Sequence, residues 1–398
     1  MPANPEFTNE ENESVEELRR RLKDDVRTEM YDDKMMFYRF LKARDFNIDN
    51  AEIMLRNHLN WRTENGIDTI LKDHKPSEVF QKFLPISFIG YDKEGCIVRY
   101  LSVGKADVKG LCLSMKYADF ARDFNHLMET DMALLEKQSK ALGRRVDKCI
   151  YIHDYEGITF GQVSNRRAIQ DLIRYFISYQ NNYPERLKAV FAINASMYFQ
   201  FAFSIIKPCL AGTVVEKVHV FGTDGWKEEL LNRIDAEQLP AFLGGKRTDP
   251  DGNPNCKTFI HQGGIIPESY YIHKSKRSLA NAPGTKKVVL SRAAFHEENI
   301  LVQEPGSLIE WEFETKIRDI GFGLFLHDYV SGEEKVKEIV PLQRIDTEEY
   351  AEAGMYKCQE SGKYVMVFDN TYSWMRSKEI FFKINVIRPN DEKKTENV

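Results

Sequence analysis

The 398-residue sequence lacks the cysteine pairs that mark disulfide-rich or zinc-binding proteins. Its six cysteines are scattered, none stands in a CxxC pair, and none lies near histidine at the spacing of a zinc site. This usage is typical of a reduced, cytoplasmic protein. Residues 1–17 are acidic and contain no apolar core segment, so we expect no secretory signal.

The chain also lacks an excess of one charge and the motifs of common enzymes. A formal net charge of −5 excludes a strongly basic nucleic-acid binder, so we expect no nucleic-acid partner. The motifs GxSxG, HExxH, GxxxxGK[ST] and GxGxxG are absent. Asp154 and Glu156 near His153 could form an acid–base pair, but no nucleophile or metal motif accompanies them. We therefore expect no enzyme, no catalytic residue, and neither a metal nor a cofactor.

One feature stands out against these absences: residues 189–206 form an 18-residue stretch without charge. By length it borders on a membrane span. Polar Asn194 and Ser196 divide it, which predicts a short buried strand followed by a helix that ends near Pro208. The helix is apolar nearly all round, so it is either ordinary core or a lid over an apolar cavity.

The pattern of apolar residues divides the chain into parts. Helical spacing gives way to alternating strands and helices, which indicates an α/β domain with a mostly parallel sheet. A Gly- and Pro-rich linker follows, whose Ile265 and Ile266 we expect to pack on the preceding domain. The period then changes to two, typical of an all-β sandwich. The expected parts are a helical lobe (1–75), an α/β domain (76–245), a wrapping linker (246–283), a β-sandwich (284–390) and a charged tail (391–398).

Three local patterns resemble one family. Residues 39–46, RFLKARDF, followed by Trp61 and Arg62, resemble the N-terminal helical motif of CRAL-TRIO lipid-transfer proteins. NYPERL at 182–187, IKPCL at 206–210 and LGG at 243–245 resemble the lipid-binding core of that family. DPDGNPNC at 249–256 and FDNTYS at 368–373 resemble the linker and the C-terminal GOLD (Golgi dynamics) domain of its animal, SEC14-like branch.

The resemblance implies a function and a set of site residues. The apolar helix is the gate of a lipid pocket, and the strand 148–155 offers a wall, because Tyr151, His153 and Tyr155 share one face. A satisfied core histidine is the alternative for His153. The expected pocket and gate residues are Tyr151, His153, Tyr155, Tyr198, Phe199, Phe201, Phe203, Ile205, Ile206 and Leu210.

The resemblance also implies a head-group site at Arg44, Glu185 and Lys217. In relatives that carry phosphatidylinositol, the residue after the arginine is basic, whereas here it is Asp45. We therefore expect weak phosphatidylinositol binding and a neutral or isoprenoid ligand. The alternative for Arg44 and Glu185 is a salt bridge that ties the helical lobe to the core.

The expected function is to bind one hydrophobic lipid, such as a phospholipid, a tocopherol-like or an isoprenoid molecule, and to transfer or present it between membranes. The alternative is a lipid-regulated adaptor in Golgi or vesicle trafficking, with a protein partner for the GOLD domain. The expected location is cytoplasmic with transient contact to a membrane surface. In the sandwich, Tyr372, Trp374, Arg376 and Lys378 could form a membrane-contacting loop or an ordinary solvated face.

Overall fold

The computed structural model describes residues 7–272, 279–330, 333–347, 351–374 and 376–389, so the expected tail at 391–398 lies outside the described residues. The chain forms two compact units. The first comprises Met1–Ile158 and Asp171–Tyr271, and the second comprises Thr159–Gln170 and Ile272–Val398. Each unit is described by itself below.

The N-terminal lobe of the first unit is a group of helices around its own apolar cluster. Thr8 and Glu11 form a capping box that fixes the start of the first helix. Leu18, Phe37 and Leu55 are fully buried where three of the helices meet. The helices of this group are α1 (Asn9–Arg21), α2 (Thr28–Tyr31), α3 (Lys34–Lys42) and α4 (Ile48–Glu64). They are followed by α5 (Ile70–Asp73) and α6 (Glu78–Phe83), whose Phe80 packs in a different cluster with Phe124.

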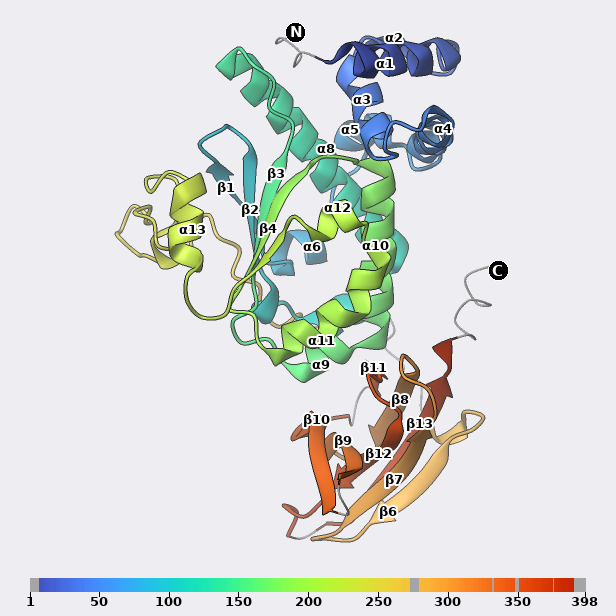
Figure 1. The fold of residues 1–398 in the computed structure, drawn as a ribbon. Helices are drawn as coiled ribbons and strands as arrows, with labels where there is room; N and C mark the ends of the chain where they lie inside the picture. Colours follow the sequence, from blue (N-terminus) through green and yellow to red (C-terminus); the bar gives the residue numbers. More distant parts are fainter. Residues whose placement is uncertain (1–6, 273–278, 331–332, 348–350, 375, 390–398) are drawn as a thin grey trace. The chain divides into compact units, whose positions relative to one another are not determined.

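A five-stranded sheet forms the centre of the first unit (Figure 1). Its order is β1-β2-β3-β4-β5, in which β1 and β2 form an antiparallel hairpin and the remaining neighbours are parallel. The expected α/β fold with a mostly parallel sheet is confirmed. The strands are β1 (Ile86–Tyr91), β2 (Ile97–Ser102), β3 (Cys149–Asp154), β4 (Leu187–Ile193) and β5 (Val218–Val220).

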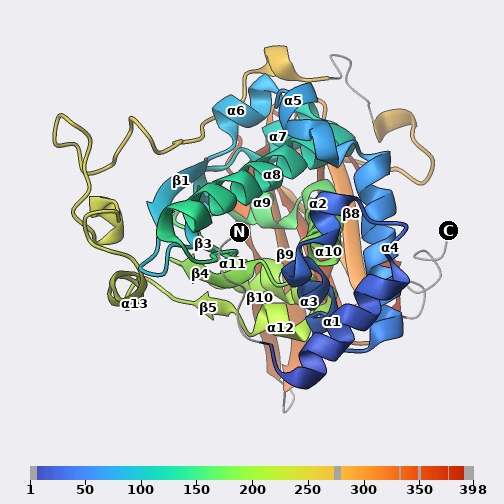
Figure 2. The same cartoon turned by 90° about the horizontal axis from the view of Figure 1, so that it is seen from above.

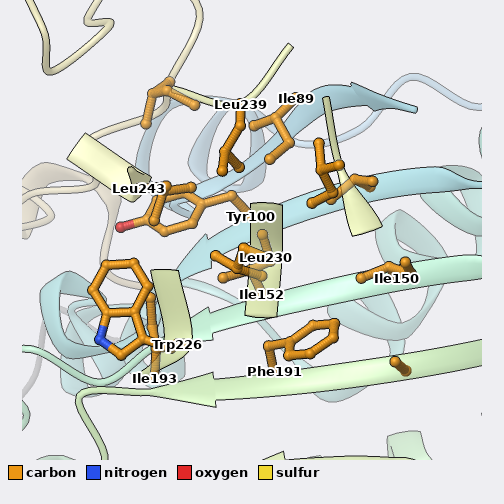
Figure 3. Packing of buried hydrophobic residues seen from close by; sticks show 14 of the residues in the cluster. Ile89, Tyr100, Ile150, Ile152, Phe191, Ile193, Trp226, Leu230, Leu239 and Leu243 are labelled. Atoms are coloured by element: carbon orange, nitrogen blue, oxygen red, sulfur yellow. The ribbon is translucent and has the colours of Figure 1, made fainter. Parts of the chain in front are cut away.

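Different elements cover the two faces of this sheet. On one face, Ile150 and Ile152 of β3 pack with Trp226 and Leu230 of α13 (Figure 3). On the other face lie α8 and α10, side by side in Figures 1 and 2, with the apolar α11. The helices of this unit are α7 (Val108–Ser114), α8 (Tyr117–Leu142), α10 (Arg166–Asn182, from Asp171 on), α11 (Met197–Ile206), α12 (Gly212–Val215) and α13 (Trp226–Arg233), whereas α9 (Phe160–Ser164) belongs to the second unit.

The linker segment up to Tyr271 belongs to the first unit. Cys256 and Ile260 join the core beside α13, and Ile266 joins the cluster that contains Phe80. Ile265, which we expected to pack inward, is 85% exposed, because its neighbour Ile266 takes the inward position.

The second unit contains a sandwich of two four-stranded antiparallel sheets, as expected, with orders β10-β9-β12-β7 and β11-β8-β13-β6. Trp311 and Phe313 of β8 point into its core against Phe322 of β9. The strands are β6 (Lys286–Leu290), β7 (Phe295–Val302), β8 (Leu308–Thr315), β9 (Asp319–Val330), β10 (Glu333–Asp346), β11 (Glu352–Lys357), β12 (Gly362–Asp369) and β13 (Lys378–Ile387).

Residues 159–170, which follow β3 in the chain, group with the sandwich. Phe160 stacks on Trp311 with ring centroids 6.2 Å apart, and Arg166 Nε lies 2.9 Å from the carboxylate of buried Glu310. The sequence pattern did not predict this grouping, because an α/β crossover normally stays with its own sheet.

A buried ion pair stabilises the first unit between α8 and β2. Arg99 and Asp131 are both almost fully buried, and Arg99 Nη2 lies 2.5 Å from Asp131 Oδ1. Burial raises the pKa of Asp131, while the hydrogen bonds from Arg99 act in the opposite direction. Removing one partner would leave the other charge in the core without compensation.

We predict that Asp131→Asn lowers the free energy of unfolding by about 3–5 kcal/mol, because the Arg99 charge then remains buried and unpaired. Chemical denaturation with a probe of the first unit measures the change. The matched control is Glu136→Gln, which breaks the exposed Lys140–Glu136 pair of the same helix and should change stability by less than about 0.5 kcal/mol. Equal effects of the two variants would contradict the structural role assigned to the buried pair.

Candidate functional site

A row of ring side chains runs from β3 onto α11. Along β3 the ring centroids of Tyr151 and His153 are 6.1 Å apart, and those of His153 and Tyr155 are 6.5 Å apart. Tyr155 meets Phe199 of α11 edge to face at 4.6 Å, and Phe199 stacks on Phe203 at 5.4 Å. The structure therefore brings the expected wall and the expected gate helix together in one aromatic row.

Two side chains of this row, Tyr151 and His153, belong to β3, and Tyr155 directly follows the strand. Tyr151, His153 and Tyr155 are each half-buried by surface area. Yet burial raises the pKa of both tyrosines and lowers the pKa of His153 to about 4. Side chains that keep accessible surface while they are shielded from bulk water are typical of the wall of an internal space.

The 18-residue apolar stretch breaks where the sequence predicted. β4 ends at Ile193, and Ser196 caps α11 by accepting a hydrogen bond of 3.3 Å from the backbone N–H of Tyr198. Within α11, Phe199, Ile205 and Ile206 are buried, whereas Tyr198, Phe201 and Phe203 are half-buried. In the described part of the chain, no helix has the length and apolarity needed to cross a membrane.

Helices α8 and α10 add residues to the same face that sequence reasoning missed. Tyr175 of α10 lies 4.6 Å from Phe124 of α8 between ring centroids, and 6.3 Å from Tyr179. The hydroxyl of Tyr151 lies 3.7 Å from the sulfur of Met128. The signal was present, because Tyr175, Tyr179 and Tyr183 are spaced by four and so share one side of a helix.

A second group of expected residues lines a pocket of about 330 Å³ at the C-terminal end of α10. Arg44, Glu185, Lys217 and Leu210 all belong to its lining. Lys217 Nζ lies 3.5 Å from the carboxylate of Glu185. The structure thus brings the three proposed head-group residues together, with Leu210 beside them.

The expected Arg44–Glu185 salt bridge is wrong. In the described residues, the lobe contributes Lys42 instead, whose Nζ lies 3.8 Å from the carboxylate of Glu185. Arg44 Nη1 donates a hydrogen bond of 2.8 Å to the carbonyl of Ala43. The reason is geometric: α3 ends at Lys42, and the chain then turns so that Arg44 lies over its own backbone.

Asp45 does not line this pocket. Its backbone, like that of Glu185, adopts a positive φ, at 51° and 58° respectively, which is uncommon for residues other than glycine. The turn at Asp45 carries its side chain to an exposed position outside the lining. The charge reversal at Asp45 therefore lies outside the group that holds Glu185 and Lys217.

Gln180 connects α10 to the end of the apolar helix. Its amide Nε2 donates to the carbonyl of Cys209 at 3.2 Å, and its Oε1 accepts from the backbone N–H of Ala211 at 2.6 Å. Both bonds fall on the segment that follows α11. This clamp fixes one end of α11, while the other end begins directly after β4.

Comparison with known proteins decides the family. The model of the CRAL/TRIO domain matches residues 83–245, that of the CRAL/TRIO N-terminal domain matches residues 7–57, and that of a Golgi-dynamics membrane-trafficking domain matches residues 328–386. Both the domains and their order are those expected. The chain belongs to the CRAL-TRIO family with a C-terminal GOLD domain.

The similar proteins include Protein real-time of Aedes aegypti, 29% identical over 306 residues, which cover 74% of this chain and 46% of that protein. Protein ctg-1 of Caenorhabditis elegans is 26% identical over 352 residues, which cover 87% of this chain and 90% of that protein. This CRAL-TRIO chain thus spans about half the length of the first relative and most of the second. The crystal structure of Sfh5 matches with a TM-score of 0.48 and 20% identity, over 67% of this chain and 96% of Sfh5.

We predict that His153 makes the stability of this CRAL-TRIO protein pH-dependent. Its folded-state pKa of about 4 lies below the unfolded value of 6.5, so the unfolded state binds more protons between these values. Stability should therefore fall as the pH drops from 6.5 toward 4, by up to about 1.4 kcal/mol per pH unit for one histidine.

Denaturation curves across this pH range should show a shallower loss for His153→Gln than for the wild type. His58 is a matched comparison, because burial also lowers its pKa to about 4, although it hydrogen-bonds Asn182 at 3.0 Å. The effects of His153→Gln and His58→Gln should add. A His153→Gln profile identical to that of the wild type would refute the shielded position of His153.

Proposed function

We propose that this protein binds one hydrophobic lipid in an internal pocket between β3, α8, α10 and α11, and that α11 is the gate of this pocket. The observation that carries the proposal is the aromatic row: Tyr151, His153 and Tyr155 are each only half-buried, and Tyr155 meets Phe199 of α11 edge to face at 4.6 Å. A lipid tail in contact with this row would remove the remaining exposed surface. The match to the CRAL/TRIO domain supports lipid binding in general.

The free-energy cost of exposing a lipid to water explains why such a carrier needs a gate. A two-chain lipid has roughly 30 methylenes, and exposing each to water costs about 0.8 kcal/mol, so its free transfer through water costs on the order of 20 kcal/mol. A carrier lowers this cost only if the lipid passes directly from the bilayer into an apolar pocket. The half-buried Tyr198, Phe201 and Phe203 on α11 are placed to contact lipid when the helix moves.

The proposed ligand is a phospholipid, a tocopherol-like molecule or an isoprenoid, with its apolar part along the aromatic row and its head at the pocket of Arg44, Glu185 and Lys217. In this proposal the protein performs no reaction and holds no cofactor. It acts in the cytoplasm and meets membranes transiently, to transfer or present the lipid.

A second candidate is a lipid-regulated adaptor, in which the GOLD domain binds a protein partner and the lipid acts as a signal. The match of residues 328–386 to a Golgi-dynamics membrane-trafficking model favours keeping this candidate. The two differ in one measurable respect: a carrier extracts its lipid from donor vesicles and delivers it to acceptor vesicles, whereas an adaptor keeps it.

We predict that Phe203→Asp lowers lipid transfer between vesicles at least tenfold, because the gate would then place a charge on the apolar surface that meets lipid. The free energy of unfolding should change by less than about 1.5 kcal/mol, because Phe203 is only half-buried.

The matched control for the gate is Ile53→Asp, which places the same charge at a side chain of α4 that is 59% exposed. This control should transfer lipid like the wild type. If Phe203→Asp unfolds the protein while its remaining folded fraction transfers lipid normally, α11 is ordinary core.

The head-group pocket yields a separate prediction. Lys217 and Arg44 both line it, so replacing either with Ala should lower phosphatidylinositol binding about tenfold while leaving tocopherol binding unchanged. Asp45→Lys should leave both unchanged, because Asp45 lies outside the lining. This differs from the expectation that Asp45 excludes phosphatidylinositol. Binding measured by lipid extraction tests it, and a several-fold gain for Asp45→Lys would restore that expectation.

A further inference from the structure

Three of the connections at one end of the sandwich strands are residues 291–294 between β6 and β7, 316–318 between β8 and β9, and 370–377 between β12 and β13. Residues 347–351 between β10 and β11 form a further connection at this end, which the structure describes only in part. The strand register places the first three together, because Leu290 pairs with Lys378, Thr315 with Ile380, and Phe295 with Asp369. We call these three connections, with the adjoining Phe295, the loop end. Its strands are labelled in Figure 1.

Hydrogen bonds join these connections to one another. Asn370 Nδ2 donates to the carbonyl of Ser291 and to that of Arg376, both at 3.0 Å, and its backbone N–H donates to the carbonyl of Ala294 at 2.8 Å. Asn370 thereby joins Arg376 and the connection between β6 and β7. The loop end is a defined surface and not a set of independent loops.

Tyr372 and Lys378 fix the same segment to the third connection. The Tyr372 hydroxyl donates to the carbonyl of Asp319 at 3.1 Å, and Lys378 Nζ lies 2.8 Å from both Asp319 Oδ1 and the Tyr372 oxygen. Burial alone would raise the pKa of Asp319, but the hydrogen bonds from Lys378 and Arg344 lower this pKa to about 2. The expectation that Lys378 is exposed is wrong, because its side chain is buried with its ammonium group paired to Asp319.

The loop end presents large apolar side chains to solvent. Trp374 is 87% exposed, Phe295 is 58% exposed, and Ile317 is 43% exposed. Single exposed apolar residues are ordinary on a protein surface. Three of them on one hydrogen-bonded end, with tryptophan the most exposed, indicate a contact surface.

The charges around these side chains are basic. Arg292, Lys316, Arg318 and Arg376 are exposed on the three connections. Among the acidic side chains that the structure describes at this end, Asp319 pairs with Arg344 and Lys378, Glu379 pairs with Lys287 and Lys316, and Asp369 accepts a hydrogen bond from Thr371. Arg318 also adopts a positive φ of 57°, which holds this arginine at a strained turn.

We propose that the loop end docks the sandwich on the surface of an anionic lipid bilayer. Tryptophan places its amphipathic ring at the level of the head groups, and arginines attract the negative charge of that surface. A bilayer is deformable, so it accepts Trp374, Phe295 and Ile317 from separate elements. This goes beyond the proposed lipid cargo, because docking requires no ligand in the α/β domain.

The test uses the full-length protein and flotation with two kinds of vesicle, phosphatidylcholine alone and phosphatidylcholine mixed with phosphatidylserine. We expect binding to the mixed vesicles only. Trp374→Ala should weaken it about tenfold. Each basic residue near an anionic bilayer raises the affinity for that bilayer about fivefold. The double variant Arg292→Glu, Arg376→Glu should therefore lower the affinity for the mixed vesicles at least 25-fold.

Matched controls lie away from the loop end: Leu301→Ala, at a side chain that is 69% exposed, and the pair Lys335→Glu and Lys363→Glu, which changes the net charge equally. Both controls should bind like the wild type. In addition, tryptophan emission should shift to the blue and be quenched by brominated phospholipid in the wild type but not in Trp374→Ala. Of the other three tryptophans, Trp226 and Trp311 are buried, and half-buried Trp61 packs against His58 and Tyr183 of the first unit.

Three results would each overturn the proposal. The first is equal binding to both kinds of vesicle, and the second is an equal loss of binding in the loop-end variants and in the controls. The third is binding to an acidic protein without a shift of Trp374 emission on vesicles. The lipid that co-purifies with the protein, measured by mass spectrometry, should be the same in all variants. A change in the co-purifying lipid would concern the proposed cargo site and not the docking of the loop end. The two proposals can therefore be refuted independently.

Discussion

Helix α11 is apolar except for Gln200 and Ser204, and its apolar side chains must be covered. In water its phenylalanines would remain exposed, so the helix lies on the ring side chains of β3, where Phe199 meets Tyr155. The ends of this contact are fixed by polar groups: Ser196 caps the helix, and Gln180 holds the segment beyond it. These hydrogen bonds would keep both ends of α11 in place during the gate motion that we propose.

The lobe and the core meet where the head of a ligand would lie. Lys42 from α3 and Lys217 before β5 share the carboxylate of Glu185. Farther along the same junction, Arg62 contacts Glu129, which accepts a hydrogen bond of 2.8 Å from Tyr183. The residues of the N-terminal family motif thus hold the lobe on the core, and a phosphate could compete with Glu185 for the same lysines.

Sequence periodicity predicted the parts whose neighbours are close in the chain. The break at Asn194, the alternation along β3 and the inward Trp311 of β8 follow from spacing alone. Side-chain partners that lie far apart in sequence could not be predicted in this way. Lys378 is buried because Asp319 lies beside it, and Glu185 takes Lys42 because the chain turns back at Arg44. The grouping of residues 159–170 with the sandwich depends on contacts with β8, which no local pattern encodes.

The central claim is that an apolar ligand occupies the space beside Tyr151, His153 and Tyr155. Native mass spectrometry of the intact protein, after incubation with vesicles made from total cell lipid, tests it most directly. The account predicts one added mass per chain, which fragmentation identifies as a single hydrophobic lipid, and loss of that mass when a bulky side chain replaces His153. A folded protein that shows only the mass of its own chain under these conditions would contradict the account.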